Sequence, residues 1–149
     1  MDTSRPATIE DLEPHFNFNG SENDMELHIL ENIEDISRHC NWGEIREVKS
    51  QYTMNIKKGK IRADIMIWHK DGTGTAIEVK NATTNRNCIL AAIGQVLSYG
   101  WKMKSKLINE PRLVIASNQI NSDIYETVKH YGLPISMLMV DGDRCIYLT

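Results

Sequence analysis

The chain has 149 residues, a length that fits one domain with a single core of useful size. Hydrophobic residues make up 41% of it and charged residues 25%, and no apolar run reaches the roughly 20 residues that a membrane helix needs, so we expect no membrane partner. The net charge of -3 disfavours a protein that coats nucleic acid without specificity, but it does not exclude a site that gathers carboxylates around a cation.

The N-terminal residues and the cysteines indicate in which cellular compartment the protein is expected. Residues 1–16 contain no apolar segment of the kind found in signal peptides. Cys40, Cys88 and Cys145 are odd in number and widely spaced, which disfavours a disulfide framework or a zinc knuckle. We therefore expect a cytoplasmic protein, and a nucleoid-associated or virus-encoded one is also compatible with these features.

The chain begins with a segment that has no sustained period, so we expect an N-terminal arm over residues 1–20 and one domain over 21–149. A helix is predicted from Ser21 to about residue 40. Ser21 is a good N-cap, and acids follow it in the first turn, where the helix dipole favours them. Apolar residues at helical spacing form the expected buried stripe: Met25, Ile29, Ile33 and Ile36.

Three extended segments are predicted next. "EIREVKSQYTMNI" alternates in part and leads into the turn "KKGK", and "IRADIMIW" follows. "HKDGTG" then supplies Asp-Gly turn chemistry, and "TAIEVK" returns as the partner strand. These segments predict a meander of three strands.

The second half alternates between helices and strands. "CILAAIGQVLSYGWKMKSKL" is predicted as a long helix, "RLVIAS" as a strand, "NSDIYETVKHYG" as a helix, and "PISMLMV" and "RCIYLT" as strands. The order α-β-β-β-α-β-α-β-β predicts an α/β fold with a mixed central sheet flanked by helices. In the long helix Leu90, Ile93, Leu97 and Trp101 recur at spacings of three and four. All three tryptophans are expected in the core: Trp42, Trp68 and Trp101.

Three charges interrupt the apolar strands of the meander. Glu78 and Lys80 are two residues apart and so project from one face of their strand. Asp64 lies on the preceding strand, and the intervening turn can bring it close to that pair. The neighbouring residues are apolar, which predicts burial, where unpaired charges are costly. An exposed Glu–Lys ion pair is the alternative interpretation.

Two convergent carboxylates suit a hard cation such as Mg²⁺ or Mn²⁺, which takes oxygen ligands and retains waters. The backbone carbonyl of Val79 is a possible further ligand, and Lys80 is placed to act on a water or a phosphate. Such a set fits hydrolysis of a phosphodiester bond.

The same residues match the pattern of a known superfamily. "RAD", then thirteen residues between Asp64 and Glu78, then "EVK" resembles the PD-(D/E)xK nucleases, and "GQVLSYG" resembles the Gln-x-x-x-Tyr motif of their RecB-like branch. Residues 21–140 look most similar in arrangement to the nuclease domain of the EndoMS/NucS mismatch endonucleases. That family carries an added N-terminal DNA-binding domain, for which this chain has no room, so mismatch specificity is not carried over. Ala63 stands at the position of the superfamily's proline.

The resemblance implies roles for particular residues. Asp64 and Glu78 would bind Mg²⁺ or Mn²⁺, Lys80 would act on the water or the scissile phosphate, and Gln95 would help to position the site. An acid of the first helix would complete it, with Glu22 as first choice and Glu26 as second, although either is also typical of an ordinary helix charge.

Nucleic-acid binding needs cations, and these cluster near the predicted hairpin. The residues expected to contact nucleic acid are Lys57, Lys58, Lys60, Arg62, Arg86 and Tyr99. A solvated basic face is the alternative for the lysines. The leading hypothesis is a metal-dependent endodeoxyribonuclease that acts on DNA as a homodimer or higher oligomer, because one chain supplies one site. A nuclease-like module that binds DNA or protein without cutting is the alternative, and the choice between DNA and RNA stays open.

Overall fold

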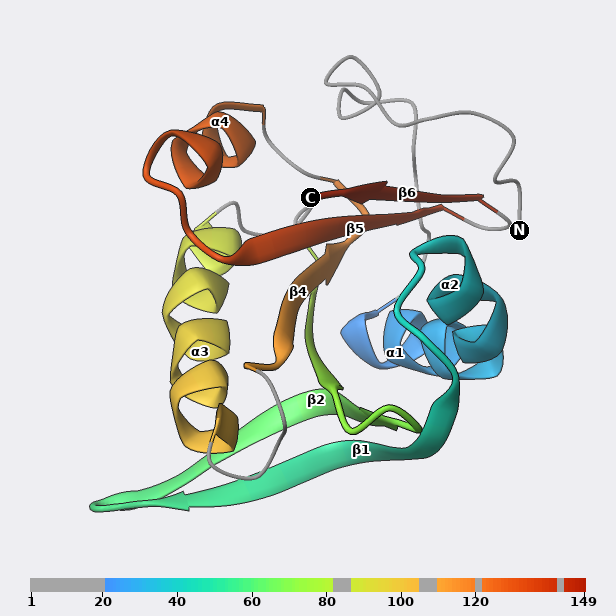
Figure 1. Cartoon of the computed structure of the whole chain (residues 1–149). Helices are drawn as coiled ribbons and strands as arrows, with labels where there is room; N and C mark the ends of the chain where they lie inside the picture. Colours follow the sequence, from blue (N-terminus) through green and yellow to red (C-terminus); the bar gives the residue numbers. More distant parts are fainter. Residues whose placement is uncertain (1–20, 82–86, 105–109, 120–121, 142–143) are drawn as a thin grey trace.

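The computed structural model describes residues 21–81, 87–104, 110–119, 122–141 and 144–149. A six-stranded sheet forms the middle layer, with α1 (Glu22–Glu31) and α2 (Ile33–His39) on one face. The other face carries α3 (Asn87–Met103) and α4 (Ser122–His130), as Figure 1 shows. This arrangement confirms the predicted α/β class with a mixed sheet flanked by helices. The arm predicted over residues 1–20 lies outside the described residues.

The strands follow chain order across the sheet. β1 (Ile45–Ile56), β2 (Gly59–His69) and β3 (Gly74–Lys80) are antiparallel neighbours and form the predicted meander. β4 (Arg112–Ser117) and β5 (Ile135–Asp141) run parallel to β3, because α3 and α4 each return the chain to the same end of the sheet. β6 (Arg144–Leu148) closes the sheet antiparallel to β5.

Two apolar clusters hold the three layers together. Alternation along β3 sends Ala76 toward α3, whereas Ile77 and Val79 pack with Met25 and Ile29 of α1. All these side chains are at most 2% exposed. The central strands are thus covered on both faces, so the polar face of β3 at Glu78 lies inside the protein.

The first predicted helix is two helices. Ser21 caps α1 as expected, with a capping box in which its hydroxyl accepts from the Asp24 N–H and the Asp24 carboxylate accepts from the Ser21 N–H. The helix ends at Asn32, whose side-chain amide donates to the His28 carbonyl at 2.9 Å. This local bond competes with the helical backbone, and α2 starts at the next residue. The predicted stripe is buried throughout, because Ile33 and Ile36 continue it in α2.

The buried stripe of α3 differs from the sequence-based expectation. Leu90 is 55% exposed and Trp101 is 70% exposed, so the prediction that all three tryptophans are core residues is wrong for Trp101. The stripe that faces the sheet is shifted by one or two residues: Ile89, Ala92, Val96, Tyr99 and Met103. Both stripes are apolar at helical spacing, so periodicity alone does not select between them.

The β1–β2 hairpin extends beyond the rest of the sheet, as Figure 1 shows. β2 pairs with β3 only between Ile65 and Trp68, whereas its pairing with β1 continues to Gly59. The free part of the hairpin carries four of the predicted basic residues, Lys57, Lys58, Lys60 and Arg62, and lies beside the C-terminal half of α3. In the part of the chain that the structure describes, no helix is long and apolar enough to cross a membrane.

Candidate active site

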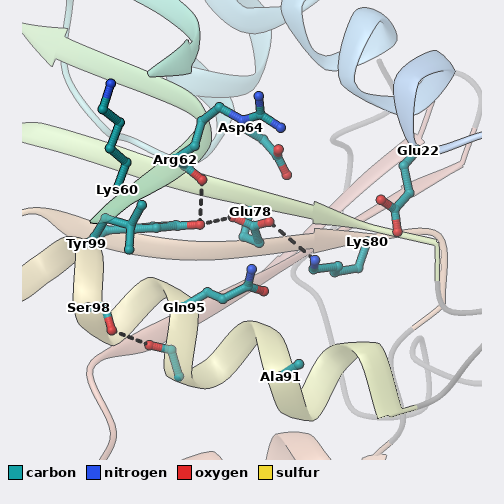
Figure 2. Close-up of a pocket in the computed structure, with 12 residues that line it drawn as sticks. Glu22, Lys60, Arg62, Asp64, Glu78, Lys80, Ala91, Gln95, Ser98 and Tyr99 are labelled. Carbon is teal, nitrogen blue, oxygen red and sulfur yellow. Dashed lines mark hydrogen bonds and ion pairs between the residues drawn. The ribbon is translucent and has the colours of Figure 1, made fainter. Parts of the chain in front are cut away.

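A cavity of about 780 Å³ opens where β2 separates from β3 and α3 covers the resulting gap. Its walls come from α1, from the two strands and from the solvent-facing side of α3 (Figure 2). Twelve residues line it: Glu22, Lys60, Ile61, Arg62, Asp64, Glu78, Lys80, Ala91, Gly94, Gln95, Ser98 and Tyr99. Most of the site residues expected from the sequence are among them.

Asp64 lies at the point where the two strands part. The ladder between β2 and β3 ends at Ile65–Ile77, so the Val79 N–H has no strand partner on that side. The Asp64 carboxylate accepts a hydrogen bond from this N–H at 2.8 Å. One carboxylate oxygen thus takes the place of the backbone acceptor that a paired strand would provide, and the bond fixes Asp64 beside Glu78 and Lys80.

Glu78 is the most deeply buried acid in the cavity, with 4% exposure. One carboxylate oxygen lies 3.4 Å from the Lys80 ammonium, and the other lies 2.5 Å from the Tyr99 hydroxyl. Lys80 is itself largely enclosed, with 17% of its side chain exposed. An exposed ion pair, the alternative considered above, is therefore not what the structure shows.

The electrostatics of Glu78 reflect its burial beside a second acid. Burial is the main cause that raises the pKa of the Glu78 carboxyl, to about 7, and the charge of Asp64 and a hydrogen bond with it raise the pKa further. The Tyr99 hydrogen bond and the Lys80 charge act in the opposite direction without cancelling the rise. Glu78 therefore retains its proton to a higher pH than an ordinary glutamate does, because its ionisation places a second buried negative charge beside Asp64.

Tyr99 holds the Glu78 carboxylate from the floor of the cavity. Its side chain is 1% exposed, and its hydroxyl also lies 2.7 Å from the Arg62 carbonyl. A phenol has one proton, so the Glu78 carboxylate and the Arg62 carbonyl share a single donor. Burial, followed by the hydrogen bond to Glu78, raises the pKa of Tyr99. Tyr99, which we expected to contact nucleic acid, thus lines the cavity as a buried side chain in contact with Glu78.

The two acids of α1 occupy different places. Glu22 lines the cavity, and its carboxylate accepts from the Asn81 N–H at 3.1 Å, just after Lys80 (Figure 2). Glu26 does not line the cavity, but accepts from the Gln51 side chain at 2.7 Å. Burial is the main cause that raises the pKa of Glu26. The structure therefore places the first choice in the site and connects the second choice to it.

Sequence reasoning missed Gln51. Its side-chain amide bridges Glu26 and Asp64, the latter at 3.3 Å, and its φ of 53° is unusual for a residue with a side chain. The register of the β1–β2 hairpin could have identified this residue. Ser50 pairs with Ile65 and Tyr52 pairs with Ala63, so Gln51 stands opposite Asp64.

The remaining predicted residues that the structure describes lie in the cavity, in a neighbouring cleft or at the hairpin turn. Gln95 projects from α3 into the cavity below Glu78, and Lys60 and Arg62 form its wall on the hairpin side (Figure 2). Lys57 lines a neighbouring cleft, and Lys58 is exposed at the hairpin turn. Arg86 lies outside the described residues.

The donor set of the cavity can be compared with what a metal needs. Within the described ranges, no group of three or more His, Cys, Asp and Glu side chains is placed to hold a metal ion. Asp64 and Glu78 provide two carboxylates, and Mg²⁺ characteristically uses one or two of these and keeps several waters. The residues therefore fit a hard cation that is mostly hydrated, and they do not fit a site made entirely of side chains.

Comparison with known proteins adds information on the fold. No protein-family description matches the chain, and no curated protein matches it in sequence. A solved structure does match: the crystal structure of a repair endonuclease from Pyrococcus abyssi, with a TM-score of 0.56 and 18% identity. The match covers 84% of this chain and 49% of that one, so the chain spans about half of its length. At this identity the match shows that the chain shares the fold of part of that endonuclease.

Proposed function

We propose that the chain is a Mg²⁺- or Mn²⁺-dependent endonuclease of the PD-(D/E)xK type that hydrolyses phosphodiester bonds in DNA. The observation that supports this most strongly is the pair of carboxylates, Asp64 and Glu78, beside the enclosed Lys80 at an open cavity. A buried acid with a pKa of about 7 beside a second acid is an unfavourable arrangement for stability alone.

The metal would be held by Asp64, Glu78 and the backbone carbonyl of Val79. When bound, the cation would polarise the phosphodiester and favour ionisation of the attacking water. The chain's own groups supply the rest. Lys80, held 3.4 Å from Glu78, is placed to donate to the attacking water or to a phosphate oxygen. Tyr99 fixes the orientation of Glu78, and Gln95 faces the same space.

Lys60 and Arg62 would bind phosphates next to the scissile bond on the hairpin side, because they line the same cavity as the carboxylates. A homodimer is part of the proposal, since cutting both strands of a duplex requires two such centres. Analytical ultracentrifugation with and without duplex DNA tests this. A chain that nicks one strand and stays monomeric on DNA would contradict the dimer without affecting the nuclease.

The decisive experiment is a cleavage assay on supercoiled, linear duplex, single-stranded and branched DNA and on RNA, with Mg²⁺, Mn²⁺ or EDTA. We expect cutting of DNA that requires the metal and stops with EDTA. If the protein binds one of these nucleic acids but cuts none of them with either metal, it is a binding module on a nuclease-like fold. That alternative has support from the site itself, which brings together the acidic side chains of Asp64 and Glu78 but no cluster of three or more His, Cys, Asp and Glu in the described residues.

Metal binding is expected to depend on pH near neutrality. A metal must displace the proton that Glu78 retains below its pKa of about 7, so binding strengthens as pH rises through 7 and weakens by up to about tenfold per unit below it. The free Mn²⁺ signal in electron paramagnetic resonance, recorded from about pH 5.5 to 8.5, measures this. An affinity that is flat between pH 6 and 8 would show that Glu78 is not a ligand.

A large side chain at Gly94 of α3 is expected to change the stability of the protein and its cleavage activity in opposite directions. Gly94 lines the cavity, and a Cβ added there meets no other atom within 4 Å. Gly94→Ala should stabilise the helix by about 1 kcal/mol and leave cleavage nearly unchanged. Gly94→Leu should also stabilise it, but its side chain occupies the space for substrate, so cleavage should fall at least about tenfold. Thermal denaturation and DNA cleavage of both variants check this, and an active Gly94→Leu variant would place the substrate elsewhere.

A further inference from the structure

Trp101 is the most conspicuous apolar side chain on the surface near the active site. It is 70% exposed, whereas Trp42 is 1% exposed and Trp68 packs edge-on against Tyr52 with ring centroids 5.0 Å apart. A tryptophan ring is large and gains stability when it is buried, so such exposure on an ordered helix needs a reason.

The ring lies in a second cleft, of about 460 Å³, between the β1–β2 hairpin and the C-terminal end of α3. Ile56 and Leu97 give the cleft an apolar wall. Ile61 and Ser98 line both this cleft and the active-site cavity, so the two lie next to each other. If a DNA strand bound with its scissile phosphate at Asp64 and Glu78, the neighbouring nucleotides would therefore lie close to Trp101.

The charges around the cleft are positive. Lys57 of the hairpin turn and Lys102 of α3 line it from opposite sides. The Lys104 ammonium lies 3.7 Å from the centroid of the Trp101 ring, a cation–π contact that holds a third positive charge against one face of the ring. An aromatic face surrounded by ammonium groups complements a nucleotide, which has a flat base and an anionic phosphate.

We propose that this cleft binds an unpaired nucleotide of the DNA next to the scissile phosphate, with its base stacked on Trp101 and its phosphates bound by Lys57 and Lys102. The proposal rests on the proposed function for its position in the reaction. Bases in a duplex are stacked on each other and do not offer a face to Trp101. The preferred substrate is therefore DNA with a single-stranded segment beside the cut.

A second copy of the chain is the competing occupant, because an exposed tryptophan in an apolar cleft is also typical of a protein interface. The cations favour DNA over a second copy, which would have to bring acids to pair with them. The two occupants give different results in the experiment.

The test measures binding without catalysis, in EDTA. Wild-type protein is titrated with a fluorescein-labelled oligo-dT and with a blunt duplex of equal length, and the quenching of tryptophan fluorescence is followed together with anisotropy. Trp101→Ala is the main variant and Trp101→Phe the conservative one. Leu90→Ala is the matched control, because Leu90 is 55% exposed on the same helix but lines neither cavity.

We expect Trp101→Ala to weaken oligo-dT binding about 5- to 100-fold, as loss of one stacked base does, and to abolish most of the quenching. Trp101→Phe should retain part of the affinity, and duplex binding should change little. Unchanged oligo-dT affinity in Trp101→Ala would overturn the proposal. A shift from dimer to monomer in ultracentrifugation with that affinity unchanged would identify a second copy as the occupant, and would also overturn it.

Failure of the nuclease function gives a different pattern. If wild type cuts nothing but loses oligo-dT affinity in Trp101→Ala, the cleft binds single strands and the catalytic assignment is wrong. If wild type cuts DNA and Trp101→Ala binds and cuts as wild type does, the nuclease stands and the cleft has no part in it.

Discussion

Replacing Asp64 by Asn is expected to lower metal-dependent DNA cleavage by about a thousandfold, which corresponds to about 4 kcal/mol of transition-state stabilisation. The amide has nearly the same shape as the carboxylate, and its oxygen can still accept from the Val79 N–H, now 2.8 Å away. The fold should therefore be retained while the negative charge that holds the cation is lost. Single-turnover cleavage with Mg²⁺ measures the effect.

Asp35→Asn is the matched control for this substitution. Asp35 lies on α2 with 57% of its side chain exposed, and its carboxylate pairs with Arg38 at 2.7 Å. The Asp35→Asn variant should therefore cleave DNA at the wild-type rate. Equal activity of Asp64→Asn and Asp35→Asn would remove Asp64 from the reaction, and an unfolded Asp64→Asn protein in circular dichroism would show a structural role instead.

Replacing Glu78 by Gln is expected to abolish metal binding and yet to stabilise the metal-free protein at about pH 8. Burial and the nearby Asp64 raise the pKa of Glu78 from 4.5 to about 7 in the folded chain. Between these values the folded state holds a proton that the unfolded state has lost, so the stability of wild type falls as pH rises through this window. Gln has no proton to lose. The variant should be more stable by about 1–3 kcal/mol above pH 7, and similar to wild type near pH 4.5.

Urea denaturation of wild type, Glu78→Gln and the exposed control Glu126→Gln, in EDTA at several pH values, measures this difference. Glu126→Gln should follow wild type at every pH. A Glu78→Gln protein that is less stable than wild type at pH 8 would mean that the ion pair with Lys80 outweighs the burial of the charge. The acid would then have a structural role that needs no metal.

Local rules predicted much of the site. The two-residue period of a strand placed Glu78 and Lys80 on one face, and the short turn before β3 brought Asp64 to them. Burial of this polar face also followed from the sequence, because apolar neighbours on both strands predicted a covered sheet. The class of fold followed from the order of elements, and the fold shared with part of the Pyrococcus abyssi endonuclease agrees with it.

Other features depend on tertiary structure that the sequence does not express locally. α3 has two overlapping apolar stripes, and only packing against the sheet decides that Tyr99 turns inward and Trp101 outward. Tyr99 thereby became a partner of Glu78 rather than a surface contact. Gln51 reaches Asp64 through hairpin register and a left-handed backbone, and the break at Asn32 depends on one side-chain bond.

The central claim is that Asp64 and Glu78 form a metal centre, and direct metal binding tests it most simply. Mn²⁺ binding at about pH 8 is compared between wild type and the double variant Asp64→Asn/Glu78→Gln by electron paramagnetic resonance. We predict that wild type binds one Mn²⁺ that Mg²⁺ displaces, and that the double variant, still folded, loses this ion. Equal Mn²⁺ binding by both proteins would contradict the account.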